Sequence, residues 1–283
     1  VIIEILKWRK NDLSPTGKVV EVLGKPGDHE TEISTIIKQN ELPLKFPNQV
    51  EEYAKNINKE ISREEIEKRR DIREILTFTI DPEDAKDFDD AISFRIKEKN
   101  IYEIGIHIAD VGHYVEKESI LDKEAFNRAT SIYLVDRVVP MLPEILSNNV
   151  CSLRPQEEKY TFSAIFNINK KGEILKEWFG KSVIKSNRRF SYAEAQEIIE
   201  TKKGNIKKEI ALKNKEYKVS EKTVNAILVL NEIATTLREE RKKQGSINFN
   251  KKEIKFKLDS KKNPIEVIFK ENKEANKLIE EFM

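Results

Sequence analysis

Four aspartates stand close together in the segment TIDPEDAKDFDDAISF: Asp81, Asp87, Asp89 and Asp90. The first ends an apolar stretch, and the other three directly precede the next one. Carboxylates brought together in this way repel one another at neutral pH unless a cation lies among them. Mg²⁺ binds carboxylate oxygens together with substrate phosphate oxygens, and two such ions about 4 Å apart promote phosphodiester hydrolysis. A divalent-metal site that handles a phosphate ester is therefore the functional interpretation of this segment.

Three other interpretations compete with the metal site. A run of like charges is usually a solvated loop, although Phe88 and the flanking apolar stretches favour burial. Asp89 and Asp90 at the start of a helix would offset its dipole. A calcium loop of the EF-hand type is disfavoured because the required glycine and the terminal glutamate are absent. Residue types alone do not decide between a metal site and a solvated acidic loop.

Hydrophobic periodicity and turn residues predict the elements that position the aspartates. Strands are expected at 76–81, 91–98 and 101–111, with a hairpin turn at Lys99-Asn100, and at 160–184 as a pair around a Lys-Gly turn. Helices are expected at 32–39, 50–57, 121–129, 191–200 and 219–244. Ser62 and Glu65 form a capping box that predicts a further helix through Arg73.

Composition narrows the class of protein. Of the 283 residues, 38% are hydrophobic and 36% are charged, which predicts a packed core under a charged surface. No apolar run approaches the roughly 20 residues of a membrane span. The first residues do not have the pattern of a signal peptide. The single Cys151 cannot form an internal disulfide. A reducing cytoplasm is expected, and a cysteine zinc cluster is excluded.

Basic residues gather in one segment, although the formal net charge is only +2. Residues 202–222 hold three glutamates and eight lysines: Lys202, Lys203, Lys207, Lys208, Lys213, Lys215, Lys218 and Lys222. An acidic focus beside a basic surface suits a metal site that handles a polyanion. A solvated, lysine-rich helix and loop explains the run equally well.

Both ends of the sequence predict a longer natural polypeptide. Residues 1–30 supply two strands around a turn, and two strands cannot close a barrel. At the other end, Ala275, Leu278, Ile279 and Phe282 fall on one helical face, and no glycine, asparagine or proline ends that helix. We therefore expect further segments on both sides.

Long strings in the sequence resemble the ribonuclease R / ribonuclease II (RNB-type) family. TIDPEDAKDFDDAI is similar to the family's catalytic motif, and further matches follow in the family's order: IGIHIADVGHYV, AFNRATSIYLVDRVVPMLPEILSNNVCSLRP, KSNRRFSY, GSINF and ANKLIEEFM. Bacterial ribonuclease R is the nearer match. The opening segment, VIIEILKW through GKVVEVLG, resembles the end of the cold-shock-type OB domain that precedes the catalytic domain.

The resemblance implies an α+β chain of three parts. These are the end of an OB-type β-barrel (cold-shock domain) at 1–45, a helical linker at 46–76, and a mixed α/β ribonuclease catalytic domain, truncated at its C-terminus, at 77–283. The implied activity is processive 3′→5′ hydrolysis of single-stranded RNA to nucleoside 5′-monophosphates, by a Mg²⁺-dependent two-metal mechanism in a monomer.

The resemblance also implies roles for particular residues. Asp81, Asp87, Asp89 and Asp90 match the catalytic aspartates; all four are expected at the metals, and substitution of Asp89 is expected to harm catalysis most. Four further residues match RNA contacts: Tyr133 and Phe249 on the terminal base, Glu281 on the terminal ribose, and Tyr192 near the 3′ end. Without the resemblance, the aromatic residues are ordinary core candidates.

The expected roles of five other residues are less specific. His107 lies in an alternating strand and is expected to be a hydrogen-bonded core residue rather than a metal ligand. Asp110 is expected to support the site from behind the metal ligands. Arg137, Arg188 and Arg189 contact phosphates or pair with surface carboxylates.

Two departures from the family limit what this chain does alone. The later arginine motif, which would stabilise charge on the scissile phosphate, lies beyond Met283, as does the C-terminal OB-type domain. The resemblance therefore implies that this chain by itself cleaves RNA weakly or not at all. A non-catalytic RNA-binding module is the second hypothesis, and four mutually repelling carboxylates count against it. A structural calcium-binding protein is the third.

Overall fold

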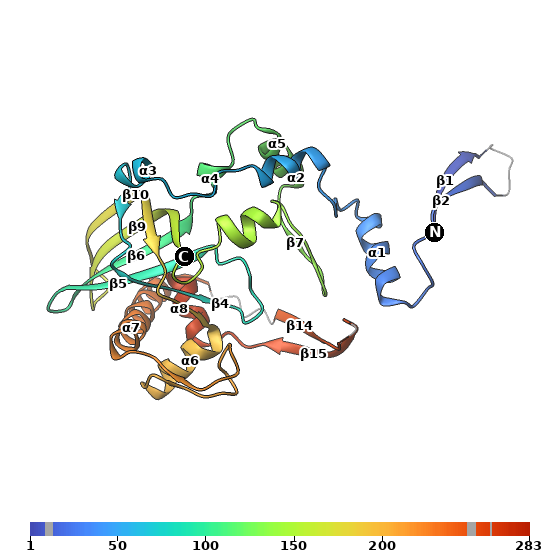
Figure 1. Ribbon diagram of the computed structural model, residues 1–283. Helices are drawn as coiled ribbons and strands as arrows, with labels where there is room; N and C mark the ends of the chain where they lie inside the picture. The colour runs from blue at the N-terminus through green and yellow to red at the C-terminus, as the bar shows by residue number, and fades with distance from the viewer. Residues whose placement is uncertain (9–13, 248–252, 261) are drawn as a thin grey trace.

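The computed structural model describes residues 1–8, 14–247, 253–260 and 262–283. An N-terminal extension projects from a mixed α/β body (Figure 1). The extension consists of a hairpin of β1 (Ile2–Lys7) and β2 (Thr16–Glu21), followed by helix α1 (His29–Gln39). Both strands expose their apolar side chains because no second layer covers them. The predicted pair of strands is confirmed.

A seven-stranded sheet forms the centre of the body. Its order is β11-β4-β5-β6-β9-β10-β3. The inner strands are antiparallel, and each edge strand pairs in parallel. The bounds of the strands are β3 (Arg70–Asp71), β4 (Leu76–Asp81), β5 (Asp90–Glu98), β6 (Ile101–Ala109), β9 (Glu158–Asn169), β10 (Ile174–Lys185) and β11 (Arg188–Ser191). The two predicted hairpins are confirmed, with Asn100 at positive φ in the first turn.

Three helices cover one face of the sheet (Figure 1): α6 (Tyr192–Thr201), α7 (Glu221–Lys243) and α8 (Glu274–Phe282). Alternation along β5 sends Ile92 and Phe94 toward these helices, where they join one hydrophobic core with Ile227 and Leu230 of α7. The same core holds Leu278 of α8. Burial on this face orients α6, whose first residue is a candidate site residue.

The other face of the sheet packs against shorter elements. These are α2 (Asn48–Lys55), α3 (Arg63–Glu67), α4 (Val111–Tyr114), α5 (Ile120–Arg128) and a wide, π-type helical turn at Leu146–Val150. A second core joins Val50, Leu121 and Leu146 to Val183 of β10. None of the described helices combines the length and the apolar character that crossing a bilayer requires.

Three small hairpins lie at the edge of the body. They are β7 (Ile132–Tyr133) with β8 (Val138–Val139), β12 (Asn205–Ile206) with β13 (Tyr217–Lys218), and β14 (Glu253–Leu258) with β15 (Pro264–Lys270). They were absent from the elements expected from the sequence. β7 matters most here, because it carries Tyr133.

The predicted helix from Ser62 through Arg73 is wrong beyond its first turns. The Ser62 hydroxyl accepts a hydrogen bond from the Glu65 amide, and α3 begins as expected. The helix ends at Glu67 because the following residues form β3, in which Arg70 pairs with Ser182 of β10. A capping motif reports where a helix begins, whereas its length here is set by pairing with a distant strand.

Candidate active site

The aspartate segment is a loop between two neighbouring strands. β4 ends at Asp81, β5 begins at Asp90, and β4 pairs with β5. Phe88 anchors the loop: its amide donates to Ser152 Oγ at 3.1 Å, and its carbonyl accepts from the Leu153 amide at 2.8 Å. The Asp89 carbonyl also accepts from the Ala109 amide at 3.0 Å. The loop is therefore anchored to the body through Phe88 and the Asp89 carbonyl, while the side chains of Asp84 and Asp89 remain exposed.

Asp81 is the most deeply placed of the four carboxylates. Only 5% of the residue is exposed, and the Thr79 hydroxyl donates to its Oδ2 at 2.5 Å. Burial raises the pKa of Asp81 to about 7, the Thr79 hydrogen bond opposes this rise, and the charge of Asp90 adds to it. A nearby cation would stabilise the ionised form of a carboxyl group in this setting.

Asp89 and Asp90 share that condition. Burial raises the pKa of each carboxyl, and a neighbouring carboxylate raises it further: Asp87 acts on Asp89, and Asp89 acts on Asp90. The four groups therefore form an electrostatic series from Asp87 through Asp89 and Asp90 to Asp81. The aspartates that the sequence singled out therefore act on one another electrostatically.

The donor chemistry of this series suits a hard divalent cation, because every donor is a carboxylate oxygen. Across residues 1–8, 14–247, 253–260 and 262–283, however, no three histidine, cysteine or acidic side chains are already close enough together to hold an ion. The raised pKa values supply the positive evidence of fit, since an ion among these carboxylates would relieve both their burial and their mutual repulsion.

Two tyrosines flank the carboxylate series. Tyr133 is 68% exposed, and its hydroxyl donates to Asp87 Oδ2 at 3.2 Å. Tyr192, the first residue of α6, is half-buried. Burial and the charges of Asp90 and Asp81 raise the pKa of Tyr192 to about 12. The structure thus brings both predicted tyrosines to the aspartates, while predicted Phe249 lies outside the described residues.

Glu281 does not join this group. Its carboxylate pairs with Arg241 of α7, with 2.7 Å between Nη2 and Oε2. The charge of its neighbour Glu280 makes a minor contribution to the raised pKa of Tyr192. Glu280 also accepts from Asn272 Nδ2 at 2.9 Å. Sequence reasoning missed Glu280, because the doublet in EEF gives no signal of which member faces the site.

The arginines near the site are already engaged. Arg189 Nη2 donates to the carbonyls of Pro82 and Glu83 at 2.6 and 2.8 Å, so this side chain braces the aspartate loop. The Arg188 guanidinium lies 4.0 Å from the centroid of the Tyr217 ring. Arg137 pairs with Glu30 and Asp136, which is the second of its two expected roles, pairing with carboxylates.

Two residues of β6 and its end lie behind the site. His107 is fully buried, and its Nδ1 lies 2.6 Å from Ser163 Oγ, which confirms a hydrogen-bonded core histidine. Asp110 pairs with Arg69, with 2.7 Å between Oδ2 and Nη1. Asp110 is thus paired with an arginine of the linker, and the expected support for the aspartates stays a prediction.

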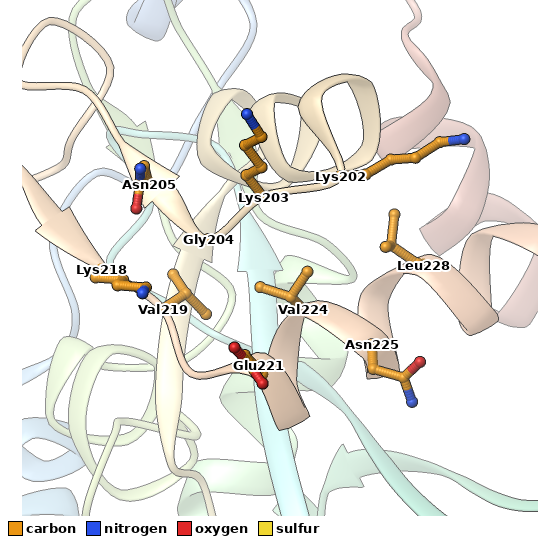
Figure 2. Close-up of a pocket in the computed structure, with 10 residues that line it drawn as sticks. All are labelled: Lys202, Lys203, Gly204, Asn205, Lys218, Val219, Glu221, Val224, Asn225 and Leu228. Atoms are coloured by element: carbon orange, nitrogen blue, oxygen red, sulfur yellow. The ribbon is translucent and has the colours of Figure 1, made fainter.

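A cavity of about 350 Å³ lies away from the aspartates, between the end of α6, the β12–β13 hairpin and the start of α7 (Figure 2). Figure 2 shows that the Lys202 and Lys203 ammonium groups point in different directions. The ten residues of α6 place this cavity about 15 Å from Tyr192. None of the four aspartates lines it, so the chemistry does not belong there.

Comparisons with known proteins agree with this arrangement. Residues 69–283 match the RNB domain, and residues 1–47 match a cold shock domain. The chain is 41% identical to DIS3-like exonuclease 2 of Schizosaccharomyces pombe over 99% of its own length and 30% of that protein. It is 39% identical to ribonuclease R of Thermotoga maritima over 100% of its own length and 39% of that protein.

A solved structure matches as well. Mycoplasma genitalium RNase R in complex with double-stranded RNA aligns with a TM-score of 0.88 at 28% identity. The alignment covers 99% of this chain and 48% of that one. The chain therefore spans less than half the length of each of these three proteins.

Proposed function

Because this chain belongs to the RNB-domain family of exoribonucleases, we propose that it is the catalytic portion of a 3′→5′ exoribonuclease that degrades single-stranded RNA processively to nucleoside 5′-monophosphates. One observation carries the proposal: a series of four carboxylates is flanked by Tyr133 and Tyr192 at one edge of the sheet. The proposal includes a monomer in a reducing cytoplasm, where the lone, buried Cys151 suits the compartment.

The proposed cofactor is Mg²⁺, held by Asp81, Asp87, Asp89 and Asp90. When bound, two such ions would supply Lewis acidity and a reactive water for the phosphodiester. The chain's own residues do the rest. Thr79 fixes the orientation of the Asp81 carboxylate through its hydrogen bond, and Arg189 holds the backbone of the loop. Pre-set carboxylates need little rearrangement when an ion and a phosphate arrive.

The tyrosines are the proposed contacts to the RNA end. The exposed ring of Tyr133 offers an aromatic face for a base, and such stacking is worth about 1–3 kcal/mol per base whatever the base. Tyr192 would lie on the other side of the carboxylates, near the 3′ end. A carboxylate of α8 would accept from the ribose 2′-hydroxyl, which separates RNA from DNA. Glu281 is the residue expected for this role, and its neighbour Glu280 is the alternative.

The test is Mg²⁺-dependent shortening of a 5′-labelled, single-stranded oligoribonucleotide, followed on a sequencing gel. It is run with this chain and with the full-length protein that contains it. We expect the full-length protein to give a ladder of products shortened from the 3′ end, and this chain alone to give weak shortening or none. In the full-length protein, Asp89→Asn should lower the rate at least about 100-fold. That substitution removes a charge from the series and preserves the shape of the side chain.

Asp84→Asn is the matched control. Asp84 lies in the same loop, but it is exposed and pairs with Lys255 at 2.8 Å, away from the series. Its substitution should leave the rate within about twofold of wild type. RNA retention without shortening in the full-length protein would favour a binding module, and calcium binding without RNA affinity would favour a structural calcium protein. Either result would defeat the nuclease proposal.

A further inference from the structure

The tip of the β7–β8 hairpin contacts α1 through four polar and charged side chains: His29, Glu30, Asp136 and Arg137. Arg137 Nη1 donates to Glu30 Oε1 at 2.9 Å, and its Nη2 donates to Asp136 Oδ2 at 2.7 Å. His29 Nε2 lies 3.3 Å from the same Asp136 oxygen. The Asp136 side chain is shielded from solvent beside His29, whereas Glu30 is 69% exposed, so the Arg137–Glu30 pair lies at the surface. We name the four residues the ionic clamp.

The base of the same hairpin is fastened by a second arginine. Arg128 is buried, and its Nη1 donates to the carbonyls of Pro43 and Pro140 at 2.6 and 3.1 Å. Its Nη2 donates to the Lys45 carbonyl at 2.8 Å. Pro140 directly follows β8, while Pro43 and Lys45 follow α1. The stretch that begins with α1 thus grips the hairpin at both ends.

The hairpin needs such support because its own pairing is minimal. β7 and β8 have two residues each, and a ladder of this size has little stability of its own. Tyr133, on β7, reaches the aspartates through the single hydrogen bond to Asp87. Its ring is mostly exposed and has little packing to orient it. The position of Tyr133 therefore depends on what holds the hairpin.

The two sides of the ionic clamp belong to different parts of the chain. His29 and Glu30 lie within the cold-shock match at 1–47, whereas Asp136 and Arg137 lie within the RNB match at 69–283. A residue beside the carboxylates is thus held by a segment that lies outside the catalytic match. Figure 1 shows α1 standing between the β1–β2 hairpin and β7.

We propose that His29, Glu30, Asp136 and Arg137 are positioning residues that hold Tyr133 over Asp87, so that α1 sets the grip of the enzyme on the 3′-terminal nucleotide. The grip on RNA rests on the proposed function, whereas the fastening of the hairpin does not. Loss of the ionic clamp should loosen the hairpin and weaken the stacking of the terminal base, while the carboxylate series stays in place.

The fastening is tested by hydrogen–deuterium exchange in Arg137→Gln, which removes the charge that joins both acidic partners. We expect amides of 131–141 to exchange at least 10-fold faster, with β4 and β5 unchanged. Lys38→Gln is the control, because it breaks another ion pair of α1, that with Glu21, without touching the hairpin. If Arg137→Gln also speeds exchange throughout the sheet, the milder variant Arg137→Lys is used in its place. Exchange in 131–141 should then rise by less than in Arg137→Gln but stay faster than in wild type. Unchanged exchange in the hairpin would overturn the proposal.

The consequence for RNA is tested with an oligoribonucleotide that carries 2-aminopurine at its 3′ end, since stacking on an aromatic ring quenches its fluorescence. Arg137→Gln should weaken binding 3- to 10-fold in the wild-type background and add no further loss in Tyr133→Ala. Equal loss in both backgrounds would show that Arg137 acts elsewhere, and the proposal would fail. No RNA binding by the wild-type chain would instead refute the proposed function, and hydrogen exchange would still decide the fastening.

Discussion

At the scale of single residues, the most informative side chain outside the candidate site is His107. It is fully buried, and its ring lies against Gly105, where an added Cβ would stand 2.8 Å from Nε2. Burial, with a smaller contribution from the charge of Arg70, lowers the pKa of His107 to about 3. In the unfolded chain this imidazole titrates near 6.5. His107 thus contributes stability that is fully present above pH 6.5 and is lost as pH falls toward 3.

The resulting prediction compares wild type with His107→Gln, which keeps a neutral group beside Ser163. Between pH 7.5 and 5.0, wild type should lose about 2 kcal/mol more of its free energy of unfolding than the variant, since 1.5 pH units below 6.5 are worth about 1.4 kcal/mol each. Urea denaturation at the two pH values measures this. The titration of other groups is common to both proteins, so parallel pH profiles would contradict the assignment.

At the scale of elements, the start of α6 is held by the buried carboxylate of Glu194. It accepts from the Ser191 amide at 2.9 Å, the Leu212 amide at 3.0 Å and the Tyr217 hydroxyl at 2.7 Å. The first bond completes a capping box, and the other two tie the β12–β13 hairpin to the helix. This carboxylate therefore fixes both the direction of α6 and the place of its first residue, Tyr192.

Glu194→Ala should lower the free energy of unfolding by about 2–4 kcal/mol, because it leaves one buried and two part-buried donors without their acceptor. Urea denaturation with an unchanged m-value measures the loss. Glu200→Ala, on the exposed side of the same helix, removes only a hydrogen bond from Gln196 and should cost less than about 1 kcal/mol. Equal losses in the two variants would show that the cap contributes nothing special.

The elements also show what can be predicted from a sequence. Period-two alternation predicts β5 and β6 with the turn between them, and the run of apolar residues predicts α7, because both patterns arise from local geometry. β14 also alternates, a signal absent from the expected strands, whereas β15 has three consecutive apolar residues and no such pattern. β7 and β8, with two residues each, are too short to leave a pattern. They depend on Arg128 and the ionic clamp, which are contacts between residues far apart in the chain.

The same distinction holds within the candidate site. The four aspartates were found because they share one loop. Tyr133 and Tyr192 were found only through the family resemblance, since 46 residues separate Tyr133 from Asp87 along the chain. The choice between Glu280 and Glu281 could not be made, because adjacent helical positions differ by about 100°. The rotation of α8 is set by burial of Leu278 and Ile279 against the main core.

At the scale of the whole molecule, the uneven distribution of charge matters more than the net charge of +2. Lys202, Lys203 and Lys218 line the cavity of Figure 2, and none of the described ion pairs includes them. The ten residues of α6 separate this cavity from Tyr192. Ammonium groups without carboxylate partners attract a polyanion that extends away from the aspartates. A short RNA held at the site would not reach them.

Replacing these three lysines by glutamine should therefore weaken binding of a long single-stranded RNA about 3- to 10-fold at low salt. The magnitude of the slope of log K against log salt should fall by up to about 2, because each of the three lost phosphate contacts contributes roughly 0.7. Binding of a trinucleotide should not change. Fluorescence anisotropy over a salt series measures both.

The control must remove the same charge from another part of the surface. Lys99 and Lys171 lie at the hairpin turns, about 30 Å along the strands from Asp90. Lys176 stands level with Arg95, about 17 Å along the strands from Asp90 and three strands away. Their joint replacement by glutamine lowers the net charge equally, but it should alter the binding of long RNA less than twofold. If both triple variants weaken binding alike, only the overall charge acts. If neither does, the lysine run is a solvated surface, and RNA leaves the site by another route.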